Sequence, residues 1–337
     1  MKEAMCYTRI ENDRVHCFLC SQHCRIEPEG IGKCGVRQNR DGKLFSLVYG
    51  KLVASHVDPV EKKPLFHFLP GSTSYSIATV GCNFECAFCQ NADISQPPRI
   101  SGGIYGRDAS PREIVEQAQQ EGCGSISYTY TEPTIFMEYA LDVAAPAKER
   151  GLENIFVTNG YMSGEALDAA APFLGAANVD LKSFSDAFYR EKCGASLKPV
   201  LKTLEAMKKK SIWLEVTTLL ILGVNDSEAE LKQIARFLAG LGPETPWHVS
   251  RFHPAYRMMD VRATPVETIR KARQIGLEAG LRYVYTGNVP GDDGENTFCH
   301  SCGALLIARI GYSVKKQNLK GGVCATCGAP LAGVGLD

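Results

Sequence analysis

Three cysteines in one short segment carry the clearest chemical signal in the chain. Cys82, Cys86 and Cys89 have the spacing C-x3-C-x2-C and follow the strand-like run 74–80. Three thiolates at this spacing can bind three irons of a 4Fe-4S cube and leave the fourth iron open to a small molecule. A zinc knuckle with a distant fourth ligand is the alternative, although zinc sites favour C-x2-C pairs. We therefore predict a cluster that does chemistry rather than one that only transfers electrons.

A second set of cysteines lies near the carboxyl end of the chain. Cys299, Cys302, Cys324 and Cys327 form two C-x2-C-Gly knuckles. Two such turns can present four thiolates to one tetrahedral ion, which is typical of a zinc ribbon. A rubredoxin-like iron site is the alternative. The pattern predicts a zinc-ribbon-like module over 291–337 with a mainly structural role.

A third set of cysteines lies near the amino end. Its members are Cys17, Cys20, Cys24 and Cys34. Glycines on both sides of the last member allow the tight turns that a metal loop needs. Zinc and an auxiliary 4Fe-4S cluster both fit this spacing, and the glycine-punctuated pairs favour zinc. We predict an amino-terminal metal-binding segment over 1–70.

Composition narrows the class of protein. The chain has 337 residues, 45% of them hydrophobic, and 37 basic residues balance 37 acidic ones. A neutral chain has no general attraction for nucleic acid or anionic lipid, so neither is an expected partner. No apolar run reaches the length of a membrane span, and the first nine residues lack the apolar stretch of a secretory signal. Fourteen cysteines are then better explained by metals in a reducing cytoplasm than by disulfides.

Between the outer cysteine sets, strand-like and helix-like segments alternate. The strand-like runs are 74–80, 124–129, 154–158, 178–181, 212–220, 248–252 and 281–285. Helical segments lie near 111–122, 133–150, 163–174 and 198–210, and two more begin at the capping sequences 227–230 and 264–267. This alternation predicts an α/β domain over 71–290 with six βα units around a parallel sheet, either as an open partial barrel or as part of a closed eight-fold barrel.

Polar residues follow four of these strands. They are Thr131 and Glu132, Thr158 and Asn159, Asp180 and Lys182, and His253. The carboxyl ends of parallel strands meet at one edge of a barrel, where functional groups gather. Asp180 and Lys182 are two residues apart on a strand and therefore face the same side, so both can point into one polar pocket.

The cysteine loop resembles that of the radical S-adenosylmethionine (SAM) enzymes, most of all the branch of the pyruvate formate-lyase activating enzyme. The resemblance rests on C-x3-C-x-aromatic-C followed closely by Asn91. The resemblance favours the open partial (β/α)6 barrel over the closed eight-fold barrel. It also implies that the open iron chelates SAM and that the reduced cluster cleaves SAM to a 5'-deoxyadenosyl radical, with the electron coming from an external donor. Phe88 would then lie near the adenine.

The same resemblance assigns the strand-end residues to SAM. Glu132, with Thr131 as a hydroxyl partner, would hold the amino group, and the sequences Thr158-Asn159-Gly160 and Asp180-Leu181-Lys182 match two other family turns. Lys182 would neutralise the SAM carboxylate, and His253 would contact the nucleoside. Val157 stands where the activating enzymes carry an aspartate, which in some of them helps hold a monovalent cation.

Nearly the whole chain resembles one subgroup, the radical SAM protein of the AmmeMemoRadiSam system. The match includes the segments 17–24 and 32–37 and the carboxy-terminal cysteines. It implies a functional link to MEMO-family and AMMECR-family proteins. We expect a radical enzyme that removes hydrogen from a substrate not identified by the sequence, which could be a protein. The alternatives are an activase of a glycyl-radical enzyme and a non-catalytic, metal-bearing RNA-binding or scaffold protein.

Overall fold

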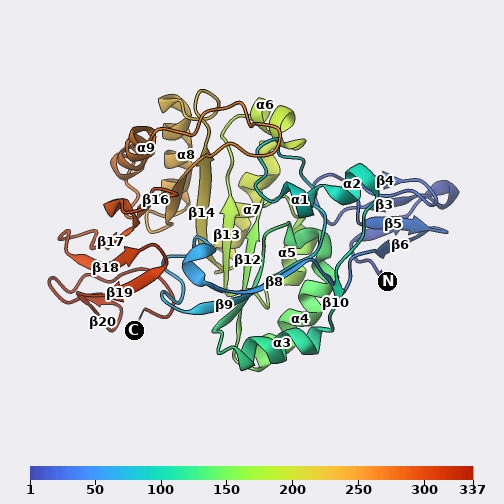
Figure 1. Cartoon of the computed structure of the whole chain (residues 1–337), viewed down its shortest axis with the longest axis horizontal. Coiled ribbons are helices and arrows are strands. Elements are labelled where there is room, and N and C mark those ends of the chain that lie inside the picture. The colour runs from blue at the N-terminus through green and yellow to red at the C-terminus, as the bar shows by residue number, and fades with distance from the viewer. Residues whose placement is uncertain (337) are drawn as a thin grey trace.

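The structure, a computed structural model, describes residues 1–336 and is built around one eight-stranded sheet (Figure 1). Its strands, in chain order, are β8 (Ala54–Pro59), β9 (Thr73–Ala78), β11 (Ser125–Tyr128), β12 (Glu153–Thr158), β13 (Ala176–Asp180), β14 (Trp213–Leu220), β15 (Trp247–Arg251) and β16 (Val284–Gly287). All but β8 run parallel, and neighbours in the chain are neighbours in the sheet. Strands β8 and β16 are its two edges, so the described sheet is open and the closed-barrel alternative is wrong.

The seven predicted parallel strands are all present, and the helices between them begin where local sequence favours it. The main helices are α3 (Pro111–Gln120), α4 (Met137–Glu149), α5 (Gly164–Ala170), α7 (Leu197–Lys209), α8 (Glu228–Leu241) and α9 (Val266–Glu278). Ser110 and Ser227 cap α3 and α8, each accepting from the backbone N–H three residues ahead. These two caps were predicted.

Two local predictions need correction, and one helical region was not predicted. The predicted helix over 133–150 begins as the 3-10 turn η3 (Pro133–Phe136) and becomes α-helical only at Met137. The expected cap at Thr264 is wrong, because its hydroxyl donates to the carbonyl of Leu220 and α9 starts after Pro265 without a side-chain cap. Between β13 and α7 the chain also forms α6 (Asp186–Phe188) and the π-helical turn η4 (Tyr189–Cys193), which the sequence did not predict.

The two ends of the chain form small antiparallel sheets on opposite sides of the molecule (Figure 1). The amino-terminal strands are β1 (Lys2–Glu3), β2 (Tyr7–Arg9), β3 (Val15–Cys17), β4 (Arg25–Ile26), β5 (Arg37–Arg40) and β6 (Lys43–Ser46); β7 (Lys51–Leu52) pairs with β10 (Arg107–Asp108). The carboxy-terminal strands are β17 (Thr297–Phe298), β18 (Leu305–Ile310), β19 (Ser313–Lys316), β20 (Leu319–Lys320) and β21 (Val323–Cys324). Strand β8 lies within 1–70 but is part of the main sheet.

The amino ends of the parallel strands are covered by the segment 60–69 and by the carboxy-terminal module that joins it. Val60, Leu65 and Phe68 pack with Ile155 and Ala176 of the sheet in one buried cluster. The carboxy-terminal module joins this packing through backbone hydrogen bonds between 67–69 and Val334. The carboxyl ends of the strands are therefore the end at which a site can form. Across residues 1–336, no helix combines the length and apolar character needed to cross a membrane.

Candidate active site at the carboxyl end of the sheet

The segment 81–91, called the cluster loop below, follows β9 and is held by backbone hydrogen bonds to distant parts of the chain. The N–H groups of Glu85 and Ala87 donate to the carbonyls of Cys193 and Lys192, at 3.0 and 2.8 Å, and the carbonyl of Ala87 accepts from Arg257 at 2.9 Å. At the start of the loop, Gly81 has φ +103°, and an added Cβ would lie 2.6 Å from Val36. The loop can therefore hold its thiols in fixed positions before any cofactor binds.

The three thiols of the cluster loop lie too far apart for one metal ion. Cys86 is buried, and Cys82 and Cys89 are half-buried. In the described chain, the only group of three or more cysteine, histidine or carboxylate ligand atoms within 4.8 Å of one another is at the carboxy-terminal cysteines. Around one zinc, the thiolates stand about 3.8 Å apart, since each Zn–S bond is about 2.3 Å. A cube binds each cysteine through a different iron and needs the wider spacing. The donor set thus fits a 4Fe-4S cluster and does not fit a zinc knuckle.

Another buried thiol lies beside the cluster loop. Cys193, at the end of η4, is fully buried and donates a hydrogen bond to Cys86, which lowers the pKa of Cys86. Burial raises the pKa of Cys193 itself. A lone cysteine about a hundred residues from the cluster loop gave no signal in the sequence that it would contact the loop.

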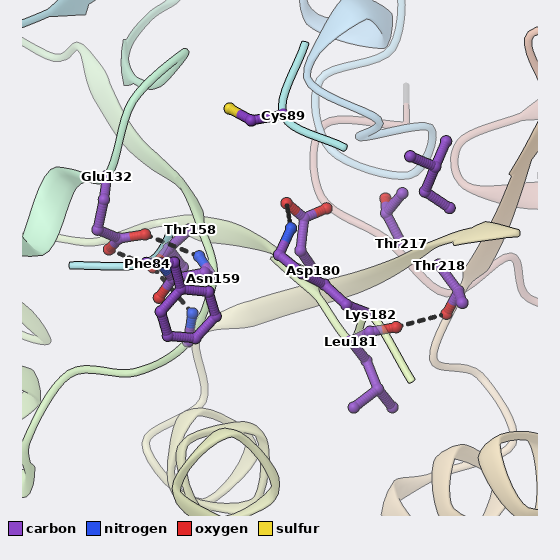
Figure 2. A network of polar contacts seen from close by, with 12 residues as sticks. Phe84, Cys89, Glu132, Thr158, Asn159, Asp180, Leu181, Lys182, Thr217 and Thr218 are labelled. Carbon is purple, nitrogen blue, oxygen red and sulfur yellow. Dashed lines mark hydrogen bonds and ion pairs between the residues drawn. The ribbon is translucent and has the colours of Figure 1, made fainter. Parts of the chain in front are cut away.

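Glu132 ties two strand ends together. Its carboxylate accepts from the Thr158 hydroxyl at 2.7 Å and from the backbone N–H of Asn159 at 2.8 Å (Figure 2). It also accepts from the backbone N–H of Thr134 at 3.1 Å. Asn159 in turn donates to the side chain of Asn83 in the cluster loop, at 2.7 Å. Burial raises the pKa of Glu132, although these hydrogen bonds oppose the shift. The residues predicted at the ends of β11 and β12 are therefore joined to the cluster loop in one network.

The turn before Glu132 is also fixed to its neighbours. The Thr131 hydroxyl donates to the carbonyl of Thr79 at 2.8 Å, and Asn91 of the cluster loop donates to the carbonyl of Tyr130, also at 2.8 Å. Tyr130 has φ +62°, in the left-handed region. Residues other than glycine rarely adopt this conformation, so contacts with neighbouring segments hold the turn.

Asp180 and Lys182 meet at the end of β13, as their spacing predicts. Their side chains form an ion pair of 3.0 Å (Figure 2). The Lys182 ammonium also lies 5.7 Å from the centre of the Phe88 ring. Burial by itself would lower the pKa of Lys182, but Asp180 and the nearby Cys86 and Cys193 raise it well above its usual value. Thr218 of the next strand donates to the Leu181 carbonyl at 2.9 Å and fixes the turn. A buried cation is thus held between a carboxylate and the cluster loop.

His253 and His248 lie after and within β15, in different surroundings. His253 follows the strand and is exposed, so its contact with the nucleoside stays a prediction. His248 lies near the start of the strand and is buried, with its Nε2 atom 2.7 Å from Glu215. Sequence pattern did not single out Glu215, because a glutamate inside a strand carries no motif.

The carboxy-terminal cysteines form a compact tetrad. The Sγ atoms of Cys299 and Cys327 are 3.6 Å apart, and those of Cys302 and Cys324 are 3.7 Å apart. The two knuckles have the same backbone, since Gly303 and Gly328 both have φ near +73° and both donate to the carbonyl four residues before. These separations match the thiolate spacing around one tetrahedral ion. The donor set fits a single metal.

Comparison with known proteins agrees with this geometry. Residues 76–238 match the model of the radical SAM superfamily. The chain is 46% identical to the uncharacterized protein MJ0808 of Methanocaldococcus jannaschii, over 98% of this chain and 99% of that protein. It is 28% identical to the isethionate sulfite-lyase activating enzyme of Nitratidesulfovibrio vulgaris, over 47% of this chain and 54% of the relative.

A solved structure shares the fold. The radical SAM methyltransferase from Sphaerobacter thermophilus superimposes with a TM-score of 0.50 at 20% identity, over 71% of each chain. This chain belongs to the radical SAM superfamily. It is a radical SAM enzyme, and membership of the superfamily implies a 4Fe-4S cluster and SAM.

Proposed function

We propose that this protein cleaves SAM reductively and uses the resulting radical to remove hydrogen from a substrate. When bound, the cluster and SAM supply the chemistry: one electron from the cluster breaks a C–S bond of SAM and yields methionine and the 5'-deoxyadenosyl radical. The observation that carries the proposal is the wide set of three thiols on a fixed loop at the carboxyl end of a parallel sheet. In a partial (β/α)6 barrel, this is the end that faces the substrate.

The residues of the chain have separate tasks in this proposal. Cys82, Cys86 and Cys89 bind three irons of the cube. Lys182 places a positive charge next to the cluster loop, where the SAM carboxylate would bind, and Asp180 keeps that charge in position. Glu132 orients the turns at Thr131 and at Thr158 and Asn159 through its hydrogen bonds, and in the family pattern it faces the SAM amino group.

Other parts of the molecule have supporting roles. The tetrad of Cys299, Cys302, Cys324 and Cys327 would bind zinc and stabilise the carboxy-terminal module. An external low-potential donor would supply the electron. Resemblance to the AmmeMemoRadiSam subgroup supports a functional link to MEMO-family and AMMECR-family proteins, with a protein as one possible class of substrate.

A second candidate function is the activation of a glycyl-radical enzyme. The similarity to the isethionate sulfite-lyase activating enzyme favours it. It predicts a persistent glycyl radical on a partner protein, detected by electron paramagnetic resonance after incubation with SAM and reductant. Cleavage of SAM without transfer of the radical to any glycine of the partner would leave the first proposal and exclude this one.

Anaerobic reduction of the reconstituted protein with SAM tests the main proposal. We expect 5'-deoxyadenosine in the wild type and none above background in the variant with Cys82, Cys86 and Cys89 replaced by alanine. Cys123→Ala is the matched control, since Cys123 is a buried cysteine outside all three sets. Absence of 5'-deoxyadenosine from the iron-loaded wild type, under conditions where a known radical SAM enzyme produces it, would contradict the proposal.

A further inference from the structure

The four amino-terminal cysteines surround one cavity. Cys17, Cys20, Cys24 and Cys34 all line it, together with Arg37. Cys17 ends β3, Cys24 precedes β4 and Cys34 precedes β5, so three strands bring the thiols together. The set is therefore one site with four converging sulfurs.

The carboxy-terminal tetrad provides an internal standard for the size of this site. All four of its sulfurs lie within 4.8 Å of one another, whereas no three of the four amino-terminal sulfurs do. One zinc would draw four thiolates to about 3.8 Å from each other. A 4Fe-4S cube instead binds one thiolate at each iron and so needs a wider arrangement around a hollow. The amino-terminal site has the wider arrangement and the hollow.

Arg37 supplies a second and independent observation. The residue is 2% exposed, and its guanidinium pairs with Glu138 and donates from Nη1 to Cys17 Sγ at 3.8 Å. Its Nε atom is buried and has no hydrogen-bond partner. A buried donor without a partner is unfavourable, so a partner in the cavity is expected. Cluster sulfides and thiolates accept such bonds, and the positive charge offsets the negative charge of the cluster. The backbone N–H of Lys33 also donates to Cys24 Sγ, at 3.5 Å.

We infer that Cys17, Cys20, Cys24 and Cys34 hold a second 4Fe-4S cluster, in which every iron has a cysteine ligand. The glycine-punctuated cysteine pairs favoured zinc, and the wide separation of the four sulfurs reverses that preference. A fully ligated cluster has no open iron for SAM, so its available chemistry is one-electron transfer.

The inferred cluster lies directly against the cluster loop. A Cβ added at Gly81 would come within 3.2 Å of the carbonyl oxygen of Cys34. Gln22, between two of the ligands, donates to the carbonyl of Asn83 at 2.9 Å. Backbone bonds from Ser21 to Tyr161 and from Ser163 to Leu19 also join the segment to the turn after β12. The second metal site is thus in contact with the segment that carries the first one.

Metal counting on full-length protein tests the inference. Wild-type protein purified and reconstituted without oxygen should contain about eight irons and eight sulfides per chain, with about one zinc. Replacing Cys82, Cys86 and Cys89 by alanine should leave about four irons and four sulfides. After reduction, this variant should give the electron paramagnetic resonance signal of a 4Fe-4S cluster that SAM does not alter. Cys123→Ala should keep all the iron.

Two results would overturn the inference. One is a folded variant at Cys82, Cys86 and Cys89 that contains no iron. The other is a wild type with about four irons and about two zincs per chain. If the variant does not fold, as judged by circular dichroism, the wild-type counts decide. A wild type that cleaves SAM with only about four irons would overturn the second cluster and leave the proposed function intact.

Discussion

Two carboxylates on neighbouring strands have opposite surroundings. In the register of β13 and β14, Asp180 lies beside Thr217, and Glu215 is two residues before Thr217 on the same face. The Asp180 side chain is 38% exposed and pairs with Lys182. The Glu215 side chain is completely buried and accepts four hydrogen bonds.

The partners of Glu215 come from several parts of the chain. They are the backbone N–H groups of Phe66 and His67, the Trp213 indole and His248. Burial alone would raise the pKa of Glu215, but His248 and the other donors lower it. Because its acceptor capacity is used within the protein, Glu215 fixes structure. The Asp180 carboxylate keeps exposed acceptor capacity, and Lys182 places its charge beside the cluster loop, so this pair can still bind a ligand. Changes at the amino end of the sheet should therefore reduce stability, and changes at the carboxyl end should reduce binding and activity.

The largest effect is expected in the module that covers the amino end. Cys302→Ser should remove a ligand from the tetrad, lower the zinc content, and reduce the free energy of unfolding by several kcal/mol, since binding of a structural zinc contributes about 10–16 kcal/mol in isolated fingers. Metal analysis and thermal unfolding measure both effects, with the exposed neighbour Ser301→Ala as control. A variant with normal stability that no longer cleaves SAM would show that the tetrad belongs to the active site.

The second largest effect is expected at the buried carboxylate of Glu215. Glu215→Ala should reduce the free energy of unfolding by about 3–5 kcal/mol, because it leaves buried donors without their acceptor. Denaturant unfolding measures the loss. Glu205→Ala on the exposed face of α7 is the matched control and should change stability by less than about 0.5 kcal/mol. Folded Glu215→Ala should bind SAM with unchanged affinity, and a large loss of affinity at unchanged stability would contradict the comparison.

The amino end should also make stability depend on pH. Burial lowers the pKa of His67 from 6.5 to about 4, and the imidazole bonds to Tyr285 and to the Ala332 carbonyl. In that range the unfolded chain binds a proton that the folded chain does not, so stability falls as pH drops from 6.5 towards 4. At about 1.4 kcal/mol per pKa unit, the loss is about 3 kcal/mol.

Unfolding at a series of pH values measures this dependence. His67→Gln should flatten it between pH 6.5 and 4, whereas His56→Gln at an exposed position should leave it unchanged. An equally steep dependence in His67→Gln would assign the effect to another group.

The smallest change in free energy is expected at the carboxyl end of the sheet, and it is a change in the free energy of SAM binding. Lys182→Met should weaken SAM binding by about 10-fold to 100-fold, since a hydrogen bond to a charged group contributes about 1.5–3 kcal/mol. Stability should change little, because Asp180 can be hydrated once its partner is gone. Calorimetric titration of the cluster-loaded protein measures the affinity, and Lys202→Met on exposed α7 is the control. Unchanged affinity with reduced stability would place Lys182 in the same class as Glu215.

The sequence could predict those parts of the fold that depend on local residue patterns. Strand and helix periodicity located the parallel sheet, and the serine caps at Ser110 and Ser227 located two helix starts. The strand at 281–285 was displaced to Val284–Gly287 and Thr264 was not a cap, because contacts with distant residues outweigh weak local preferences. Strand β8 had no such signal, since its place at the edge of the sheet depends on pairing with β9.

The sequence by itself determined the chemistry of the cluster loop, because metal ligation depends on residue type and short spacing. It also determined that Asp180 and Lys182 share a face, since strand geometry alternates strictly. Tertiary structure decided what depends on distance between remote segments. It placed Cys193 beside Cys86, enclosed Glu215 with His248, and made one four-cysteine set compact and the other wide around a hollow. Four cysteines at suitable spacing have the same donors in either case, and only their separation distinguishes one ion from a cube.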